Sequence, residues 1–88
     1  MRKAATFKVL EYELPIKIEG DKTGGFVATT HGWSDCYAQG DSIDEVVNEI
    51  TAVAASLIEL YKEEGFKIPL KSTLFDKSTF RIPVLTSA

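Results

Sequence analysis

The stretch from Cys36 to Ile50, CYAQGDSIDEVVNEI, joins a short apolar–polar run to the start of a helix through a single turn. Gly40 and Asp41 are typical turn residues. Ser42 and Glu45 have the spacing of a capping box, in which the serine hydroxyl accepts a hydrogen bond from the N–H of Glu45 and the glutamate carboxylate reaches back to the N–H of Ser42. We therefore expect this junction to fix how a strand is followed by a helix, which is an architectural role.

A long amphipathic helix is predicted to follow. Apolar residues recur between Ile43 and Tyr61 within about 160° of the helix circumference, which provides one broad face for packing on a sheet. Gly65 suits the position after a helix end, so the helix should contain about 22 residues. The opposite face is mostly acidic and carries Asp44, Glu45, Asn48, Glu49, Glu59 and Glu63.

Three strands are predicted before the helix. The segment from Lys8 to Ile18 alternates apolar and polar residues, so it should form a strand with one buried face. Pro15 places that strand at a sheet edge or at a bulge. The glycine-rich residues 19–25 predict a hairpin turn into a second strand, Phe26–Thr30, and Asp35–Ala38 is the third.

After the helix, Thr79–Leu85 has the pattern of a last strand. The expected order is β-β-β-α-β, an α+β fold in which an antiparallel sheet of three to four strands carries one long helix on one face. With 88 residues the chain should be a single domain, residues 1–88. One helix covers only one face of a sheet, so the other face needs a partner, and the apolar residues expected there are Val9, Val27, Ile82 and Val84.

Charge and composition narrow the class of partner. The formal net charge is -3 and the isoelectric point is near 5.0, which disfavours a phosphate backbone as the main partner and suits a basic protein. No apolar run has membrane-spanning length and no export signal is visible, so we expect a cytoplasmic protein with no membrane contact. Cys36 is the single cysteine and cannot form an intrachain disulfide.

His31, Asp35 and Cys36 lie close together in sequence and raise the question of a thiol nucleophile or a metal site. Their acidic surroundings do not favour a thiolate, and a metal site would need a fourth ligand at a defined spacing. We therefore expect no enzyme activity, no cofactor and no metal. Trp33 has two interpretations that the sequence leaves open: an aromatic anchor at an interface, or a side chain that covers the end of the core.

The order of these features resembles the HicB family of bacterial and archaeal antitoxins and its stand-alone relatives, over about residues 10 to 70. The residues that carry the resemblance are Tyr12–Ile18, the run 24–28, Cys36, Gln39–Ser42, Asp44, Glu45, Gly65, Ile68 and Pro69. The chain departs from the family at residues 30–36, which lack the usual proline-rich turn. Residues 71–88 are too few and too strand-like for the C-terminal DNA-binding segment of many members, so direct nucleic-acid binding is not expected.

The resemblance implies a HicB-like, partial RNase H-like fold and an antitoxin-like module. Such a module neutralises a small basic HicA-type RNA-cleaving toxin by covering it. Acidic residues would steer the basic partner and an aromatic residue would anchor it. The alternative is a stand-alone homo-oligomer with a structural or regulatory role and no toxin, with a dimer as the favoured state. The candidate partner-binding residues are Trp33, Asp35, Tyr37, Glu49 and Glu59.

Overall fold

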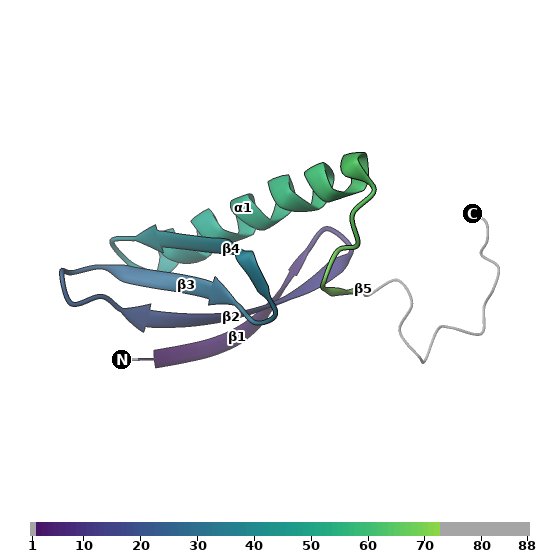
Figure 1. Ribbon diagram of the computed structural model, residues 1–88. Helices are drawn as coiled ribbons and strands as arrows, with labels where there is room; N and C mark the ends of the chain where they lie inside the picture. Colours follow the sequence, from purple (N-terminus) through teal and green to yellow (C-terminus); the bar gives the residue numbers. More distant parts are fainter. Residues whose placement is uncertain (1, 73–88) are drawn as a thin grey trace.

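The protein has the predicted α+β architecture (Figure 1). The computed structural model describes residues 2–72. Within them the elements follow in the order β1 (Arg2–Val9), β2 (Tyr12–Gly20), β3 (Phe26–Thr30), β4 (Trp33–Gly40), α1 (Ile43–Glu64) and β5 (Lys71–Ser72). The strands β1 to β4 form an antiparallel sheet in that spatial order, and β5 pairs with the start of β2. The fold class is confirmed.

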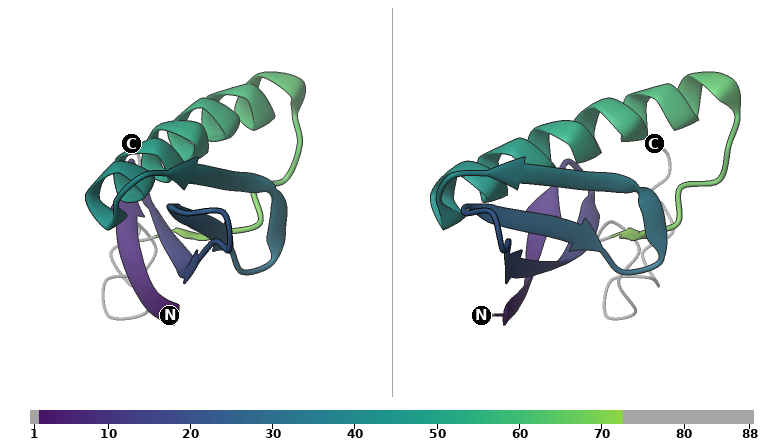
Figure 2. Two further views of the ribbon diagram at one scale, coloured as in Figure 1. Left: turned by 90° about the vertical axis from the view of Figure 1, so that its left-hand side faces the viewer. Right: turned by 60° about the vertical axis from the view of Figure 1, so that its left-hand side comes forward.

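The helix lies on one face of this sheet. It begins directly after β4, runs back along that strand, and packs mainly on β4 and to a lesser extent on β3 (Figure 2). No element among residues 2–72 lies against the other face of the sheet. The position of α1 therefore divides the surface into an outer helix side and an uncovered sheet side.

The first predicted strand was wrong in its extent and in its place, because Pro15 lies in β2, an inner strand between β1 and β3, and not at a sheet edge or a bulge. The segment from Lys8 to Ile18 is the end of β1, a two-residue turn at Leu10 and Glu11, and most of β2. Leu10 sits in the turn with a φ of 56° and is 50% exposed, although the alternation assigned it to the buried face. The pattern missed the turn because neither turn residue is a glycine, proline or asparagine, and β1 was missed because RKAATFKV does not alternate cleanly.

The later strands also differ from the prediction. β4 spans Trp33–Gly40, so Trp33 belongs to a strand and not to a loop. The register of β3 and β4 shifts between Thr29 and Thr30, which allows both Trp33 and Cys36 to point to the helix side. The short strand β5 had no signal in the sequence, and the predicted strand Thr79–Leu85 lies outside the described residues.

A single core lies between the sheet and the helix. The helix contributes an i, i+4 stripe whose narrow width leaves Leu60 46% exposed. Val9 belongs to this core and not to the uncovered face, because the β1–β2 register pairs it with Tyr12 on the helix side. The buried apolar residues are Val9, Leu14, Ile16, Ile18, Ala28, Trp33, Cys36, Ala38, Val46, Ile50, Ala54 and Ile58.

Both helix ends are capped as the sequence indicates. The Glu45 N–H donates to Ser42 Oγ at 3.1 Å, while Glu45 Oε1 accepts from the N–H of Asp41 at 2.9 Å and not from that of Ser42. Gly65 has a φ of 76°, and its N–H donates to the carbonyl of Lys62. The helix has the 22 residues expected.

The strand–helix junction requires a glycine at position 40, because the backbones approach too closely for a side chain. A Cβ atom on Gly40 would lie 2.7 Å from the backbone nitrogen of Val46 and 3.0 Å from its Cα. A Cβ atom on Gly25, whose φ is 78°, would lie 2.7 Å from the carbonyl oxygen of Gly40. The backbones of β3, β4 and α1 therefore meet in direct contact at one end of the domain.

We predict that Gly40→Ala lowers the free energy of unfolding by about 3 kcal/mol, because the new methyl group meets backbone atoms that cannot move without shifting the helix. Gly32→Ala is the matched control: Gly32 has a φ of 79° but open space around it, so it should lose only about 1 kcal/mol. Urea denaturation of the two variants measures the difference. Equal losses would show that the contact with Val46 contributes nothing.

Candidate functional site

The structure does not bring the five predicted partner-binding residues together. Trp33 is 4% exposed and packs in the core. Of the two interpretations of this residue, the structure favours a side chain that covers the end of the core. Tyr37 is 61% exposed and alternates with buried neighbours on β4, so it points away from the helix. Glu49 and Glu59 are exposed on α1, on the other side of the sheet. Tyr37 and the two glutamates therefore lie on opposite sides of the sheet, and Trp33 lies on neither surface.

A hydrogen-bonded chain links β4 to the C-terminal part of the helix. Trp33 Nε1 donates to Tyr61 Oη at 3.0 Å, and the Tyr61 hydroxyl donates to Asp35 Oδ2 at 2.6 Å. The Trp33 and Tyr61 rings meet edge to face, with centroids 5.3 Å apart, and Phe66 packs edge-on against Tyr61 in the same way at 5.6 Å. This arrangement satisfies the indole N–H of a buried tryptophan and fixes the helix over β4.

Asp35 has a structural role in this chain because its carboxylate accepts a hydrogen bond from the Tyr61 hydroxyl. The hydrogen bond to Asp35 raises the pKa of Tyr61 above the ordinary value of 10.0, and the bond from Trp33 opposes this only partly. Tyr61 had no signal in the sequence beyond its place on the apolar helix face, because its partners lie 28 and 26 residues away.

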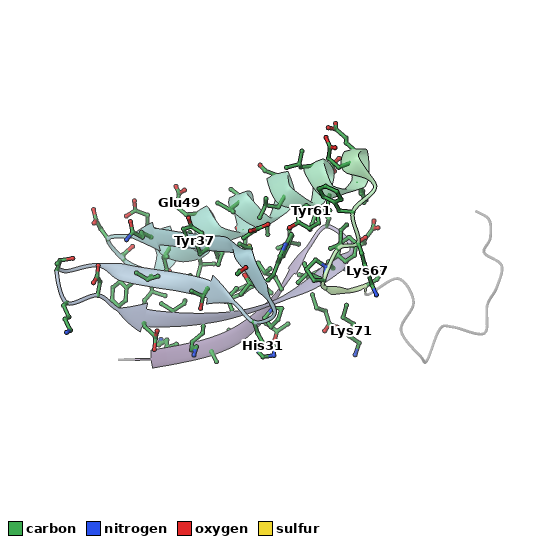
Figure 3. All side chains as sticks on the ribbon, viewed as in Figure 1. His31, Tyr37, Glu49, Tyr61, Lys67 and Lys71 are labelled. Carbon is green, nitrogen blue, oxygen red and sulfur yellow. The ribbon has the colours of Figure 1, made fainter. Side chains whose placement is uncertain are left out.

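Cys36 and His31 point to different sides of the sheet. Cys36 is buried in the core, and burial raises the pKa of its thiol, while the nearby Thr30 hydroxyl lowers it to a smaller extent. The Thr30 side chain is buried beside this thiol. His31 is exposed at the β3–β4 turn, away from the helix (Figure 3). Residues 2–72 contain no group of three side chains arranged to hold a metal ion.

The first surface with a distinct chemistry is the acidic helix surface, formed by Asp44, Glu45, Glu49, Glu59 and Glu63, all exposed. Glu49 projects from the outer side of the helix (Figure 3). Lys62 is the only basic residue in the helix, and it turns to the β1–β2 hairpin, where its Nζ lies 3.5 Å from Glu11 Oε2 and 5.9 Å from the centre of the Tyr12 ring. The carboxylates on the outer side therefore have no basic neighbour from the helix itself.

The second surface is the open sheet face, on the side away from the helix. Side chains that pair across the strands share a face, and those opposite to the core residues form this surface. A hollow of about 530 Å³ lies on it, between β1, β2 and β3. The open sheet face consists of Ala4, Thr6, Lys8, Glu13, Pro15, Lys17, Glu19, Val27, Thr29, His31, Tyr37 and Gln39.

Comparison with known proteins finds no family model, no curated protein and no solved structure that matches the chain. Among residues 2–72, no helix has both the length and the apolar character that crossing a bilayer requires.

We predict that Tyr61→Phe destabilises the protein, because it removes the acceptor of the buried Trp33 N–H and the donor to Asp35. A buried N–H without an acceptor costs about 1 kcal/mol or more. Trp33 is the only tryptophan, so its fluorescence reports both the local change and the urea midpoint. Tyr12→Phe is the control: the ring of this half-buried tyrosine packs against the core and contacts Lys62, and the substitution keeps that ring, so the variant should behave as the wild type.

A second prediction concerns pH. In a chain whose other tyrosines, Tyr12 and Tyr37, are replaced by phenylalanine, Asp35→Asn should lower the pKa of Tyr61 towards 10.0, as followed by phenolate absorbance. Because the folded-state pKa is raised, the stabilisation is complete below pH 10.0 and is lost as the pH rises through the folded-state value. An unchanged titration after the Asp35→Asn substitution would show that the Asp35 contact does not persist in solution.

Proposed function

We propose that this chain is a protein-binding module that covers a small basic partner. The family resemblance makes the partner a HicA-type RNA-cleaving toxin and the chain an antitoxin-like domain. The observation that carries the proposal is the acidic helix surface, where five exposed carboxylates lie on one element whose single lysine is engaged elsewhere. A surface of one sign speeds the encounter with a protein of the opposite sign.

The contact that holds the partner needs an apolar anchor beside these carboxylates. Trp33 cannot be this anchor, because its side chain is buried in the core. Leu60 is the exposed large apolar residue within α1, next to Glu59 and one turn from Glu63. In this proposal charge governs the rate of association, and burial of Leu60 contributes to the lifetime of the complex.

The experiment is co-expression of the chain with the adjacent short basic reading frame, followed by association kinetics. Glu49→Gln with Glu59→Gln should slow association about tenfold at low salt and weaken its salt dependence. Glu13→Gln with Glu19→Gln changes the net charge by the same amount but on β2, away from the helix, and should have little effect.

Equal effects of the two double variants would show that net charge, and not the acidic helix surface, guides the partner. If no small basic protein co-purifies and the chain instead binds RNA or DNA at physiological salt, the antitoxin proposal is wrong.

The open sheet face favours a second candidate function, the homo-oligomeric regulatory or structural protein without a toxin. A sheet face that no described element covers and that carries an exposed tyrosine is available for association with another copy. The two functions use opposite sides of the domain, so one does not exclude the other.

A further inference from the structure

We propose that a second copy of this chain docks on the open sheet face, about a twofold axis parallel to the strands, with Tyr37 of each copy over Ala4 of the other. The proposal deepens the homo-oligomer function by naming its surface and geometry, and it holds with or without a toxin partner. It rests on the register of the four strands, on the hollow in the sheet face and on the distribution of charge.

The register places four residues in one row across the sheet. Ala4 pairs with Lys17, Lys17 with Thr29, and Thr29 with Tyr37. Directly paired residues point to the same face, so all four side chains lie on the open sheet face. The smallest side chain of the row is at the β1 edge and the largest, 61% exposed, is at the β4 edge.

A hollow adjoins the small end of this row. It measures about 530 Å³, and its wall includes Ala4 and Thr6 of β1, Pro15 of β2 and His31 at the end of β3. The backbone N–H of His31 donates to the carbonyl of Pro15 at 3.1 Å, which continues the sheet into the rim of the hollow. The protein thus carries a projecting aromatic ring and a recess on the same face, at opposite edges.

Two such sheets fit together under one symmetry. An axis parallel to the strands and midway between β2 and β3 stacks β4 of one copy on β1 of the other and keeps each residue at its height along the strands. Tyr37 then meets Ala4 beside the hollow, and Lys17 meets Thr29, so within this row each large side chain faces a small one. An in-plane axis perpendicular to the strands would instead stack each strand on itself and bring the two Tyr37 edges together.

Charge favours this face over the helix side for self-association. The charged residues on the open side of β2 alternate in sign: Glu13, Lys17 and Glu19. Lys8 of β1 pairs with Glu13 in the same layer. Two acidic helix surfaces would repel each other, whereas two open sheet faces carry nearly balanced charge.

The size of the face sets the expected affinity. Under this axis β2 of one copy lies on β3 of the other, and β3 has only five residues, so the strands overlap over a length of about 17 Å. Four strands at the usual spacing cover a width of about 19 Å, so each copy contributes about 320 Å² and the pair about 650 Å². This total is below the range of standard specific interfaces, so we expect a weak dimer with a dissociation constant of about 100 μM or more.

The experiment is sedimentation of the full chain from about 10 μM to about 1 mM, with variants at the two contact points. Tyr37→Ser, which removes the projecting ring, and Ala4→Arg, which fills the recess, should each weaken dimerisation at least about tenfold. Leu60→Ala removes an exposed apolar side chain from the helix side and should leave the dimer unchanged. Circular dichroism and the fluorescence of Trp33 confirm that the variants are folded. A wild-type chain that stays monomeric throughout overturns the proposal.

Disulfide trapping tests the axis itself. Ala4 and Tyr37 of one chain are three strand spacings apart, about 14 Å, which is too far for an intrachain disulfide. Mild oxidation of a mixture of the A4C and Y37C chains, each with the native Cys36 replaced by alanine, should give crosslinked dimers that contain one chain of each kind. Crosslinking of Y37C chains mainly with each other would contradict the axis. Tyr37→Ser should leave capture of the basic partner intact, so failure of the dimer and failure of the antitoxin function are separate results.

Discussion

The domain depends on the backbone contact between Gly40 at the end of β4 and Val46 in the first turn of α1. Most strands and helices are separated by a layer of side chains. Here there is no room for such a layer, because a Cβ atom on Gly40 would lie only 2.7 Å from the Val46 nitrogen. Gly25 adds β3 to the same contact through the Gly40 carbonyl. Since the helix can leave β4 in only one direction, the stripe of Val46, Ile50, Ala54 and Ile58 follows onto the sheet.

The chain of hydrogen bonds through Tyr61 fixes the other end of the helix. Trp33 and Asp35 flank the shifted register at the start of β4, and both bond to the same phenol oxygen. A helix held over β4 at both ends cannot move to the middle of the sheet. The consequence is a surface with two different sides, one acidic and helical, the other formed by the sheet and nearly balanced in charge.

The sequence was informative where the cause of structure is local. The capping residue Ser42, the glycine at the helix end and the helix length follow from contacts within a few residues, and they are confirmed. The turn at Leu10 was missed because its left-handed conformation is imposed by the pairing of β1 with β2 and not by a turn-forming residue. The surroundings of Trp33 were also out of reach, because the register shift and Tyr61 that bury it are set by distant parts of the chain.

The separation of the two surfaces has a consequence for how the proposed functions combine. If two copies pack through their open sheet faces, each helix lies on the outside of the pair, so the two acidic helix surfaces face away from each other. The two sheets alone are about 10 Å apart, and the helices lie farther out on either side. The acidic surfaces are therefore separated by more than the screening length of about 8 Å, so the repulsion between them is small. In such a pair each acidic helix surface would stay accessible, and the proposed basic partner would bind one copy without displacing the other. The proposed dimer would therefore take up two partners, whereas a dimer built through the helices would hide the acidic surfaces.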